Sequence, residues 1–257
     1  MELQQAKDLE GRFIVQTYGR HDVLFVRGYG VRLYDHAGNE YLDMAAGIAV
    51  NALGHSDPDM IQTICNQARN LIHVSNYYYT KPQIELAQSL VRRSFADCTF
   101  FSNSGSEANE TAFKFARKWA RQKYGKDKHQ VVACTGAFHG RSMGALSLTH
   151  KGSYREPFQP LLTGVQFVGF NDERSAEDHI TERTCAVFVE PVQGEGGVVP
   201  SSPSFLRKLR QLCDEHNALL VFDEVQCGLG RTGRLWAYEN YEIEPDIMTL
   251  AKPLAGG

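Results

Sequence analysis

Six short runs of apolar, β-prone residues recur from residue 99 onward, and helical segments separate most of them. The runs are TFF (99–101), QVVACT (130–135), VQFVGF (165–170), CAVFVEP (185–191), ALLVFDEV (218–225) and IMTLAK (247–252). Apolar strands that alternate with helices are typical of a largely parallel sheet covered by helices on both faces, so we expect an α/β fold. Ligands of such sheets lie beyond the carboxyl ends of the strands, and the residues just after each run are therefore the candidates for function.

The first fifty residues have a different pattern. Residues 23–44 alternate apolar and polar side chains between turn residues, which predicts a small antiparallel meander. Residues 58–74 and 81–95 have the apolar spacing of amphipathic helices. We expect a small β-rich segment within residues 1–50 and a larger α/β part over residues 51–257.

Composition and charge exclude several classes of protein. The 257 residues carry a formal net charge of −3, so no basic character indicates a nucleic-acid or membrane partner. The six cysteines form no C-x-x-C pair, which argues against a zinc site or a disulfide framework and favours a reducing compartment. The sequence has neither the apolar core of a signal peptide nor a stretch of membrane-spanning length. These features predict a cytoplasmic protein without a metal site.

A candidate anion site follows the run at 99–101. Ser104 and Glu107 have the spacing of a helix capping box. The helical apolar stripe that follows is Ala108, Ala112, Phe115 or Ala116, and Trp119. Free N–H groups and the positive end of the helix dipole attract anions, so the backbone of Gly105 and Ser106 and the Ser106 hydroxyl are natural partners for a phosphate. A well-capped helix with nothing bound is the alternative that this motif alone leaves open.

The loop after residues 130–135 combines a flat apolar ring, an imidazole and a planar cation. These are Phe138, His139 and Arg141. Phe138 could stack on a flat cofactor, and Arg141 could hold a carboxylate with two hydrogen bonds. The alternative is a loop that Phe138 packs in place while Arg141 points into solvent.

Carboxylates and one lysine follow the last three runs. Glu190 ends a strand and Glu195 lies in a glycine-rich loop, where isolated carboxylates are usually solvated. Asp223 follows five apolar residues, so it should be desolvated and needs a partner. Lys252 ends the last run, where a lowered pKa would make it a nucleophile toward a carbonyl group. A lysine at the rim of the sheet is the alternative.

The glycines at 228, 230 and 233 match a dinucleotide-binding fingerprint only formally. In nucleotide-binding units the glycines follow the strand directly, and an acidic residue ends the next strand. Here residues 223–226 intervene and the next strand ends in Lys252. We expect these glycines to form a mobile loop, and a nicotinamide-dependent oxidoreductase is disfavoured.

Taken together, the strand ends match one cofactor. A phosphate-binding turn, a stacking ring, a buried aspartate and a carbonyl-reactive lysine are the four contacts that pyridoxal 5′-phosphate (PLP) requires. The aspartate keeps the pyridine nitrogen protonated, and the lysine can shuttle a proton between the substrate carbon and the cofactor. The sequence therefore predicts PLP as the cofactor.

The same stretches resemble signatures of the class III PLP-dependent aminotransferases. SNSGSEANE, AFHGR, EPVQGEGGV, FDEVQCGLGRTG and DIMTLAKPLAGG occur in that order, and the resemblance runs from about residue 27 to the end of the chain. AAGIAVNALGH and HVSNYYYT are most similar to the subgroup that acts on acetylornithine. The resemblance implies PLP fold type I, the fold of aspartate aminotransferase.

The resemblance also implies a role for each matching residue. For the cofactor, Gly105 and Ser106 hold the phosphate, Phe138 stacks on the ring, Asp223 pairs with the ring nitrogen, Gln226 bonds the phenolic oxygen and Lys252 forms the Schiff base. For the substrate, Arg141 resembles the arginine that binds a carboxylate, Glu195 resembles the glutamate that gates a second arginine in ornithine enzymes, and Tyr18 is expected to reach the substrate.

The activity implied is transfer of the terminal amino group of N2-acetylornithine to 2-oxoglutarate, a step of arginine biosynthesis, by a homodimer. Ornithine, 4-aminobutyrate and succinylornithine are alternative substrates within the class. These amino-acid and 2-oxo-acid substrates are the expected small-molecule partners.

Enzymes of this class continue past the lysine with a further strand and a C-terminal domain, and neither follows Gly257. We therefore expect residues 1–50 to be the N-terminal part of a small domain, residues 51–257 to be an incomplete large domain, and the C-terminal domain to be absent. A chain of this length should be weakly active or inactive alone. A truncated subunit that only pairs with an intact partner is the non-enzymatic alternative.

Overall fold

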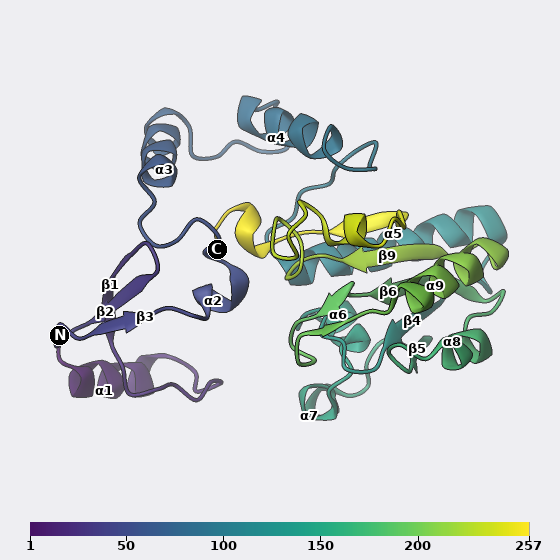
Figure 1. Ribbon diagram of the computed structural model, residues 1–257, viewed down its shortest axis with the longest axis horizontal. Coiled ribbons are helices and arrows are strands. Elements are labelled where there is room, and N and C mark those ends of the chain that lie inside the picture. Colours follow the sequence, from purple (N-terminus) through teal and green to yellow (C-terminus); the bar gives the residue numbers. More distant parts are fainter. Residues whose placement is uncertain (257) are drawn as a thin grey trace. The chain divides into compact units, whose positions relative to one another are not determined.

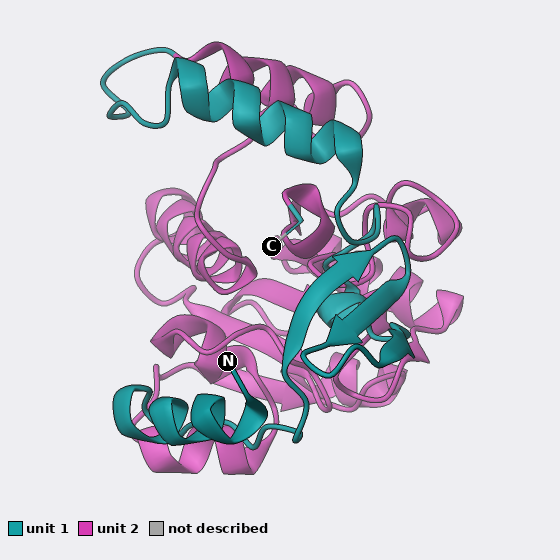
Figure 2. Cartoon of the chain, turned by 90° about the vertical axis from the view of Figure 1, so that its left-hand side faces the viewer, with its two compact units in different colours: residues 1–79, 256–257 teal, residues 80–255 magenta. Residues whose placement is uncertain are grey.

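The computed structural model describes residues 1–256 and divides into two compact units. Unit 1 comprises residues 1–79 together with Gly256, and unit 2 comprises residues 80–255 (Figures 1 and 2). The domain division suggested by the sequence, with a boundary at residue 50, stays a prediction.

Unit 1 contains the antiparallel meander that the sequence predicts. Its sheet has the order β1 (Phe25–Tyr29), β2 (Arg32–Asp35), β3 (Glu40–Leu42). Asp35 accepts hydrogen bonds from the N–H groups of Ala37 and Asn39, which closes the turn between β2 and β3. The helices of this unit are α1 (Leu3–Phe13), α2 (Ala46–Ala49) and α3 (Pro58–Asn70). The predicted helix at 58–74 is confirmed as α3, which the side chain of Asp57 caps.

Unit 2 is built on a five-stranded parallel sheet. Its strands are β4 (Gln130–Cys134), β5 (Val165–Val168), β6 (Thr184–Val189), β9 (Leu219–Asp223) and β10 (Ile247–Thr249), in the order β10-β9-β6-β4-β5 (Figure 1). Five of the six predicted runs are therefore strands. The two strands that flank β6 shield it, and every residue of β6 is buried.

The predicted strand at 99–101 is wrong. Within residues 1–256 these three residues pair with no strand, and Phe100 is 66% exposed. The ring of Phe100 instead packs edge-on against Phe115. A run of three residues is too short to hold a strand without a neighbouring strand to pair with.

Helices and short connections complete unit 2. They are α4 (Lys81–Val91), α5 (Gly105–Tyr124), α6 (Met143–Leu148), α7 (Gly152–Arg155), α8 (Glu173–His179), α9 (Pro203–Glu215), the 3₁₀ helices η1 (Glu156–Phe158), η2 (Ala237–Asn240) and η3 (Lys252–Leu254), and a hairpin of β7 (Val192–Gln193) and β8 (Val199–Pro200). The helix predicted at 81–95 is confirmed as α4. No described helix is long and apolar enough to cross a membrane.

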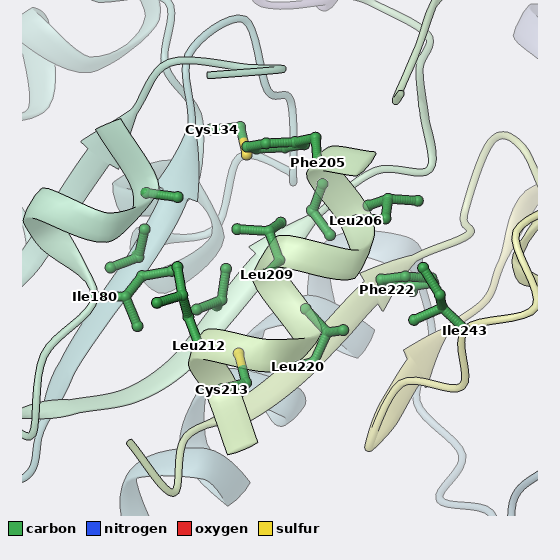
Figure 3. Close-up of a cluster of buried hydrophobic side chains, with 14 of the residues drawn as sticks. Cys134, Ile180, Phe205, Leu206, Leu209, Leu212, Cys213, Leu220, Phe222 and Ile243 are labelled. Atoms are coloured by element: carbon green, nitrogen blue, oxygen red, sulfur yellow. The ribbon is translucent and has the colours of Figure 1, made fainter. Parts of the chain in front are cut away.

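Helices cover both faces of the parallel sheet, as the apolar runs predict. Successive side chains of β6 point to opposite faces: Val187 packs with α9 in one apolar cluster, and Phe188 packs with α5 in the other. Figure 3 shows the first cluster, where Leu209 and Leu212 of α9 lie among the buried side chains. The sheet is thus fixed between two cores, and its strand ends are rigid supports for a site.

The buried stripe of α5 differs from the predicted one. Its buried residues are Asn109, Ala112, Phe113, Ala116 and Ala120. Phe115 is 46% exposed, so Ala116 is the member of that alternative pair that faces the core. The helix is turned toward Phe113 because the amide of Asn109, at the top of the stripe, belongs to a buried polar cluster described below.

Candidate active site

The carboxyl ends of the central strands bring together most of the predicted site residues in unit 2. Asp223 ends β9, and Glu190 directly follows β6, its neighbour in the sheet. The loop with Phe138 and Arg141 follows β4, which lies on the other side of β6. Lys252 follows the edge strand β10 by three residues and begins η3.

The start of α5 has the geometry of an anion site. Ser104 accepts a hydrogen bond from the N–H of Glu107, as the capping motif predicts. Within residues 1–256, the N–H groups of Gly105 and Ser106 donate to no other group of the chain. A Cβ atom on Gly105 would lie 2.7 Å from Cγ1 of Val225, so only glycine fits where the helix meets the segment after β9. Two free donors at a helix N-terminus can bind a phosphate.

Asp223 is the centre of a buried polar cluster. Its side chain is only 3% exposed, and its Oδ2 accepts hydrogen bonds from Nδ1 of His139 and Nδ2 of Asn109, both at 2.7 Å. Oδ1 accepts one from the N–H of Val225 at 2.9 Å. Thr249 of β10 donates to Oδ1 of Asn109 at 2.8 Å and so fixes the amide orientation. The sequence predicts that this carboxylate has a partner. The structure shows two, Asn109 of α5 and His139 of the loop after β4.

The His139 ring is fully enclosed, and its second nitrogen is unpaired. Burial lowers the pKa of His139, but the hydrogen bond to Asp223 and the charges of Asp223 and Glu190 outweigh burial and raise the pKa above its usual value. Within the described residues, Nε2 has no hydrogen-bond partner. An imidazole in this setting has a proton on Nδ1, which it donates to the carboxylate of Asp223.

Glu190 joins two loops of the site. Its carboxylate accepts hydrogen bonds from the N–H of Phe138 at 3.0 Å and from the N–H of Gly194 at 3.2 Å. Burial raises the pKa of Glu190 to about 7, and the charge of Asp223 adds to the increase. The expectation that this carboxylate is solvated is wrong, because the strand that carries it is covered on both faces.

Lys252 lies half-buried with a strained backbone. Its φ angle is 36°, in the left-handed region that residues with side chains rarely adopt. Burial lowers the pKa of Lys252, although nearby carboxylates oppose the change. A lowered pKa increases the fraction of neutral amine, which is the nucleophilic form.

Gln226 and Glu195 lie next to each other. Nε2 of Gln226 donates to Oε1 of Glu195 at 3.4 Å. A Cβ atom on Gly194 would overlap Oε1 of Gln226, so the glutamine side chain lies against the bare backbone of that glycine. The glycine-rich loop after β6 is therefore shaped around Gln226.

Phe138 and Arg141 share an aromatic neighbour that sequence reasoning missed. The guanidinium carbon of Arg141 lies 4.4 Å from the ring centre of Tyr154 and 5.6 Å from that of Phe138. Tyr154 and Phe138 pack edge to face with ring centres 6.2 Å apart. Tyr154 has no recognisable motif, and only the packing of α7 brings it to this loop.

Tyr18 belongs to unit 1 and is 63% exposed, and its role stays a prediction. Sequence reasoning also missed Asn109, Thr249 and Glu224. Asn109 had a usable signal, since it is a polar residue inside an apolar helical stripe. Glu224 is 1% exposed and accepts hydrogen bonds from the N–H groups of Ala237 and Tyr238, so it ties the glycine loop to η2.

The described residues fit PLP. Gly105 and Ser106 offer two free N–H groups for the phosphate, and Asp223 Oδ1 keeps a lone pair for a ring N–H, since only Val225 donates to it. Lys252 offers an amine with a lowered pKa for an aldehyde. The donor set is therefore complementary to a phosphate, a protonated pyridine nitrogen and a carbonyl carbon.

Comparisons with known proteins agree with this chemistry. The family model described as "Aminotransferase class-III" matches residues 15–257. The mitochondrial acetylornithine aminotransferase of Alnus glutinosa is 54% identical over 258 residues, which cover 99% of this chain and 57% of that protein. The chain thus spans less than two thirds of the length of this curated relative.

Solved structures show the same fold. The N-acetylornithine aminotransferase of Stenotrophomonas maltophilia K279a is 42% identical with a TM-score of 0.82, over 97% of this chain and 62% of that one. An ornithine aminotransferase of Toxoplasma gondii, with partial occupancy of PLP at its active site, is 32% identical with a TM-score of 0.93, over 98% of this chain and 60% of that one. The fold is PLP fold type I, as expected. From its family match and its fold, this chain belongs to the class III aminotransferases.

Proposed function

We propose that this chain carries the PLP-binding part of an enzyme that moves the terminal amino group of N2-acetylornithine to 2-oxoglutarate, giving N-acetylglutamate semialdehyde and glutamate. The observation that carries the proposal is the buried cluster at Asp223, where His139 and Asn109 both donate to Oδ2. A buried, hydrogen-bonded carboxylate at the end of a central strand is what a protonated pyridine nitrogen needs. The relative from Alnus glutinosa and the S. maltophilia enzyme are both named as acetylornithine aminotransferases.

PLP, when bound, supplies an electron-poor ring that stabilises negative charge on the substrate carbon. The residues of the chain do the rest. The N–H groups of Gly105 and Ser106 hold the phosphate, and Phe138 packs on the ring face. Asp223 keeps the proton on the ring nitrogen, and the side-chain amide of Gln226 donates to the phenolic oxygen.

Lys252 has two tasks in this proposal. Its Nζ would hold the aldehyde group of the cofactor, which the burial-lowered pKa favours because a neutral amine is required. As a free amine, the same Nζ would accept a proton at the substrate carbon and donate it again. Both tasks need an amine that is neutral near pH 7.

Three residues are proposed to bind the substrate. Arg141 is exposed and forms no ion pair within residues 1–256, so its guanidinium group is available for a carboxylate. Glu195, exposed beside Gln226, is the proposed gate for a second arginine. Tyr18 is the proposed contact from unit 1.

Ornithine is the second candidate for the amine donor. The T. gondii ornithine aminotransferase matches with the higher TM-score, 0.93 against 0.82, while the S. maltophilia enzyme has the higher identity, 42% against 32%. Identity is the better guide to a substrate pocket because backbone shape is shared across the fold. We therefore place N2-acetylornithine first.

We also propose a homodimer in the cytoplasm. Phe100 and Phe115 form an exposed aromatic pair, and Ile84 of α4 is 54% exposed, so unit 2 presents apolar surface that supports a protein partner. The six cysteines are all free, which suits a reducing compartment. The relative from Alnus glutinosa is named as mitochondrial.

A half-reaction tests the function. The PLP-loaded chain is mixed with N2-acetylornithine, ornithine, succinylornithine or 4-aminobutyrate, and loss of the near-visible cofactor absorbance is followed in a stopped-flow instrument. We expect the largest second-order rate constant with N2-acetylornithine. The Lys252→Ala variant should show no loss of absorbance with any of the four donors. A clear preference for ornithine would overturn the substrate assignment while leaving the aminotransferase assignment intact.

A further inference from the structure

The backbone of Arg141 is held by a chain of hydroxyl groups. Ser106 Oγ accepts hydrogen bonds from the N–H groups of Arg141, at 3.1 Å, and Ser142, at 3.0 Å. Ser142 Oγ lies 2.9 Å from Ser106 Oγ and donates to Oε2 of Glu110 at 2.7 Å. Glu110 also accepts from the N–H of Ala145, so it holds the C-terminal end of the loop that carries Arg141, where α6 begins.

The protons in this chain can be assigned. A serine hydroxyl has one proton, and the proton of Ser142 goes to Glu110. Ser106 is therefore the donor in its bond with Ser142. With two N–H groups accepted and its proton donated, the Ser106 hydroxyl is fully engaged by the loop. Ser106 can still offer its own N–H to a phosphate, and its hydroxyl aligns Arg141.

Close packing fixes the loop in this position. A Cβ atom on Gly140 would lie 2.9 Å from Cα of Ser106, and one on Gly144 would lie 2.5 Å from Oε1 of Glu110. Both glycines thus pack against the Ser106 and Glu110 side chains in the first turns of α5 and leave no room for side chains of their own. Movement of residues 141 and 142 away from the helix start would break four hydrogen bonds.

The side chain of Arg141 is held separately by Tyr154. The guanidinium carbon is 4.4 Å from the centre of that ring, within the range of a cation–π contact. The Tyr154 ring is itself supported edge-on by Phe138. Backbone and side chain of the exposed Arg141 are therefore both restrained.

We propose that Tyr154 and Ser142 are positioning residues that fix the guanidinium group of Arg141 for a substrate carboxylate. The inference rests on the proposed function for the identity of the carboxylate. It adds that affinity for the carboxylate depends on an aromatic ring and a hydroxyl group that do not themselves touch the substrate. A guanidinium group that is already oriented loses less conformational entropy on binding.

The arginine Nε–H signals of the ¹⁵N-labelled chain, without cofactor, test the restraint. Arg141 is assigned with the Arg141→Lys variant. We expect its Hε signal to be shifted upfield by the Tyr154 ring in the wild type and in Tyr154→Phe, and to move to the position of a free arginine in Tyr154→Leu. An unshifted wild-type signal, or a Tyr154→Phe variant that behaves like Tyr154→Leu, would overturn the inference.

Affinity for 2-oxoglutarate, measured by titration of the same signal, tests the consequence. Tyr154→Leu should weaken binding about three- to five-fold and Tyr154→Phe less than two-fold, as loss of one cation–π contact predicts. Ser142→Ala should weaken binding while Ser142→Thr, which keeps the hydroxyl, restores it. Equal losses in the alanine and threonine variants would contradict the role of the hydroxyl chain.

These measurements separate the inference from the proposed function. Addition of PLP to the same samples reports the cofactor by its near-visible absorbance. A colourless chain with the arginine signals as expected rejects the proposed function and supports the positioning of Arg141. A yellow chain whose Arg141 signal is the same in the wild type and in Tyr154→Leu supports the function and rejects the positioning.

Discussion

Nδ1 of His139 and Oδ2 of Asp223 lie 2.7 Å apart, in a place where the side chains are 0% and 3% exposed. They are 84 residues apart in the sequence, and they come from the loop after β4 and from the end of β9, the two strands that flank β6. Burial opposes the change, but the hydrogen bond to Asp223 and the charges of Asp223 and Glu190 raise the pKa of His139. We therefore expect this one hydrogen bond to contribute both to the stability of the fold and to the chemistry of the site.

His139→Leu should destabilise the chain by about 3 kcal/mol, since it leaves a buried carboxylate with one donor fewer. The control is His139→Asn, whose amide N–H can replace Nδ1, and it should lose less. The pKa of His139 is raised in the fold, so its contribution is complete below the unfolded value of about 6.5 and falls as pH rises through the folded value. Urea unfolding should thus show a larger deficit for His139→Leu at pH 6 than at pH 9, and a pH-independent deficit would count against the pairing.

Glu224 should make the wild type less stable as the solution becomes less acidic. Burial raises the pKa of Glu224 from 4.5 to about 7, so its contribution is complete below pH 4.5 and is lost as pH rises through about 7. This amounts to a loss on the order of 2 kcal/mol between pH 5 and pH 7.5. Glu224→Gln should have a flatter stability profile over this range, measured by urea unfolding. An equally steep profile would show that Glu224 titrates normally.

Gly105→Ala should weaken PLP binding about ten-fold or more, because its Cβ meets Val225 at 2.7 Å and the helix start must shift. The matched control is the double variant Gly105→Ala/Val225→Ala, which removes the two Cγ atoms in the way and should recover part of the affinity. The dissociation constant is measured by absorbance titration. No recovery in the double variant would mean that the glycine is needed for another reason.

Glu190→Ala should weaken PLP binding by about ten-fold, since the N–H groups of Phe138 and Gly194 lose their shared acceptor. Glu190→Gln keeps one carbonyl acceptor and should lie between Glu190→Ala and the wild type. Thermal unfolding of the same variants reports the accompanying loss of stability. Alanine and glutamine variants with identical affinities would exclude a role for the hydrogen bonds.

The strands of the sheet could be predicted from the sequence because burial on both faces leaves a continuous apolar run, as in β6 and β9. The prediction of a strand at 99–101 was wrong because a strand also needs a neighbouring strand, and no local sequence pattern shows whether one is present. The stripe of α5 was displaced by one residue for a related reason. Asn109 is polar, yet it faces the interior because its amide donates hydrogen bonds there to the side chain of Asp223 and the backbone carbonyl of His139.

Site residues could be predicted where the sequence next to them has a clear pattern. Lys252 follows an apolar run, and Gly105 stands at the start of a predicted helix. Residues that act through packing left no such signal. Tyr154 lies in a short helix after the loop of Arg141, and its ring position depends on how α7 folds back. The roles assigned to the site residues stay predictions that the variants above test.

The central claim is that Lys252 is the residue that bonds PLP. The most direct measurement is borohydride reduction of the chain after addition of PLP, followed by peptide mass analysis. We predict near-visible absorbance before reduction, its loss on reduction, and a pyridoxyl-phosphate group on the peptide that contains Lys252, with none in Lys252→Ala. Modification spread over exposed lysines, or a Lys252→Ala chain that is labelled as well as the wild type, would contradict the claim.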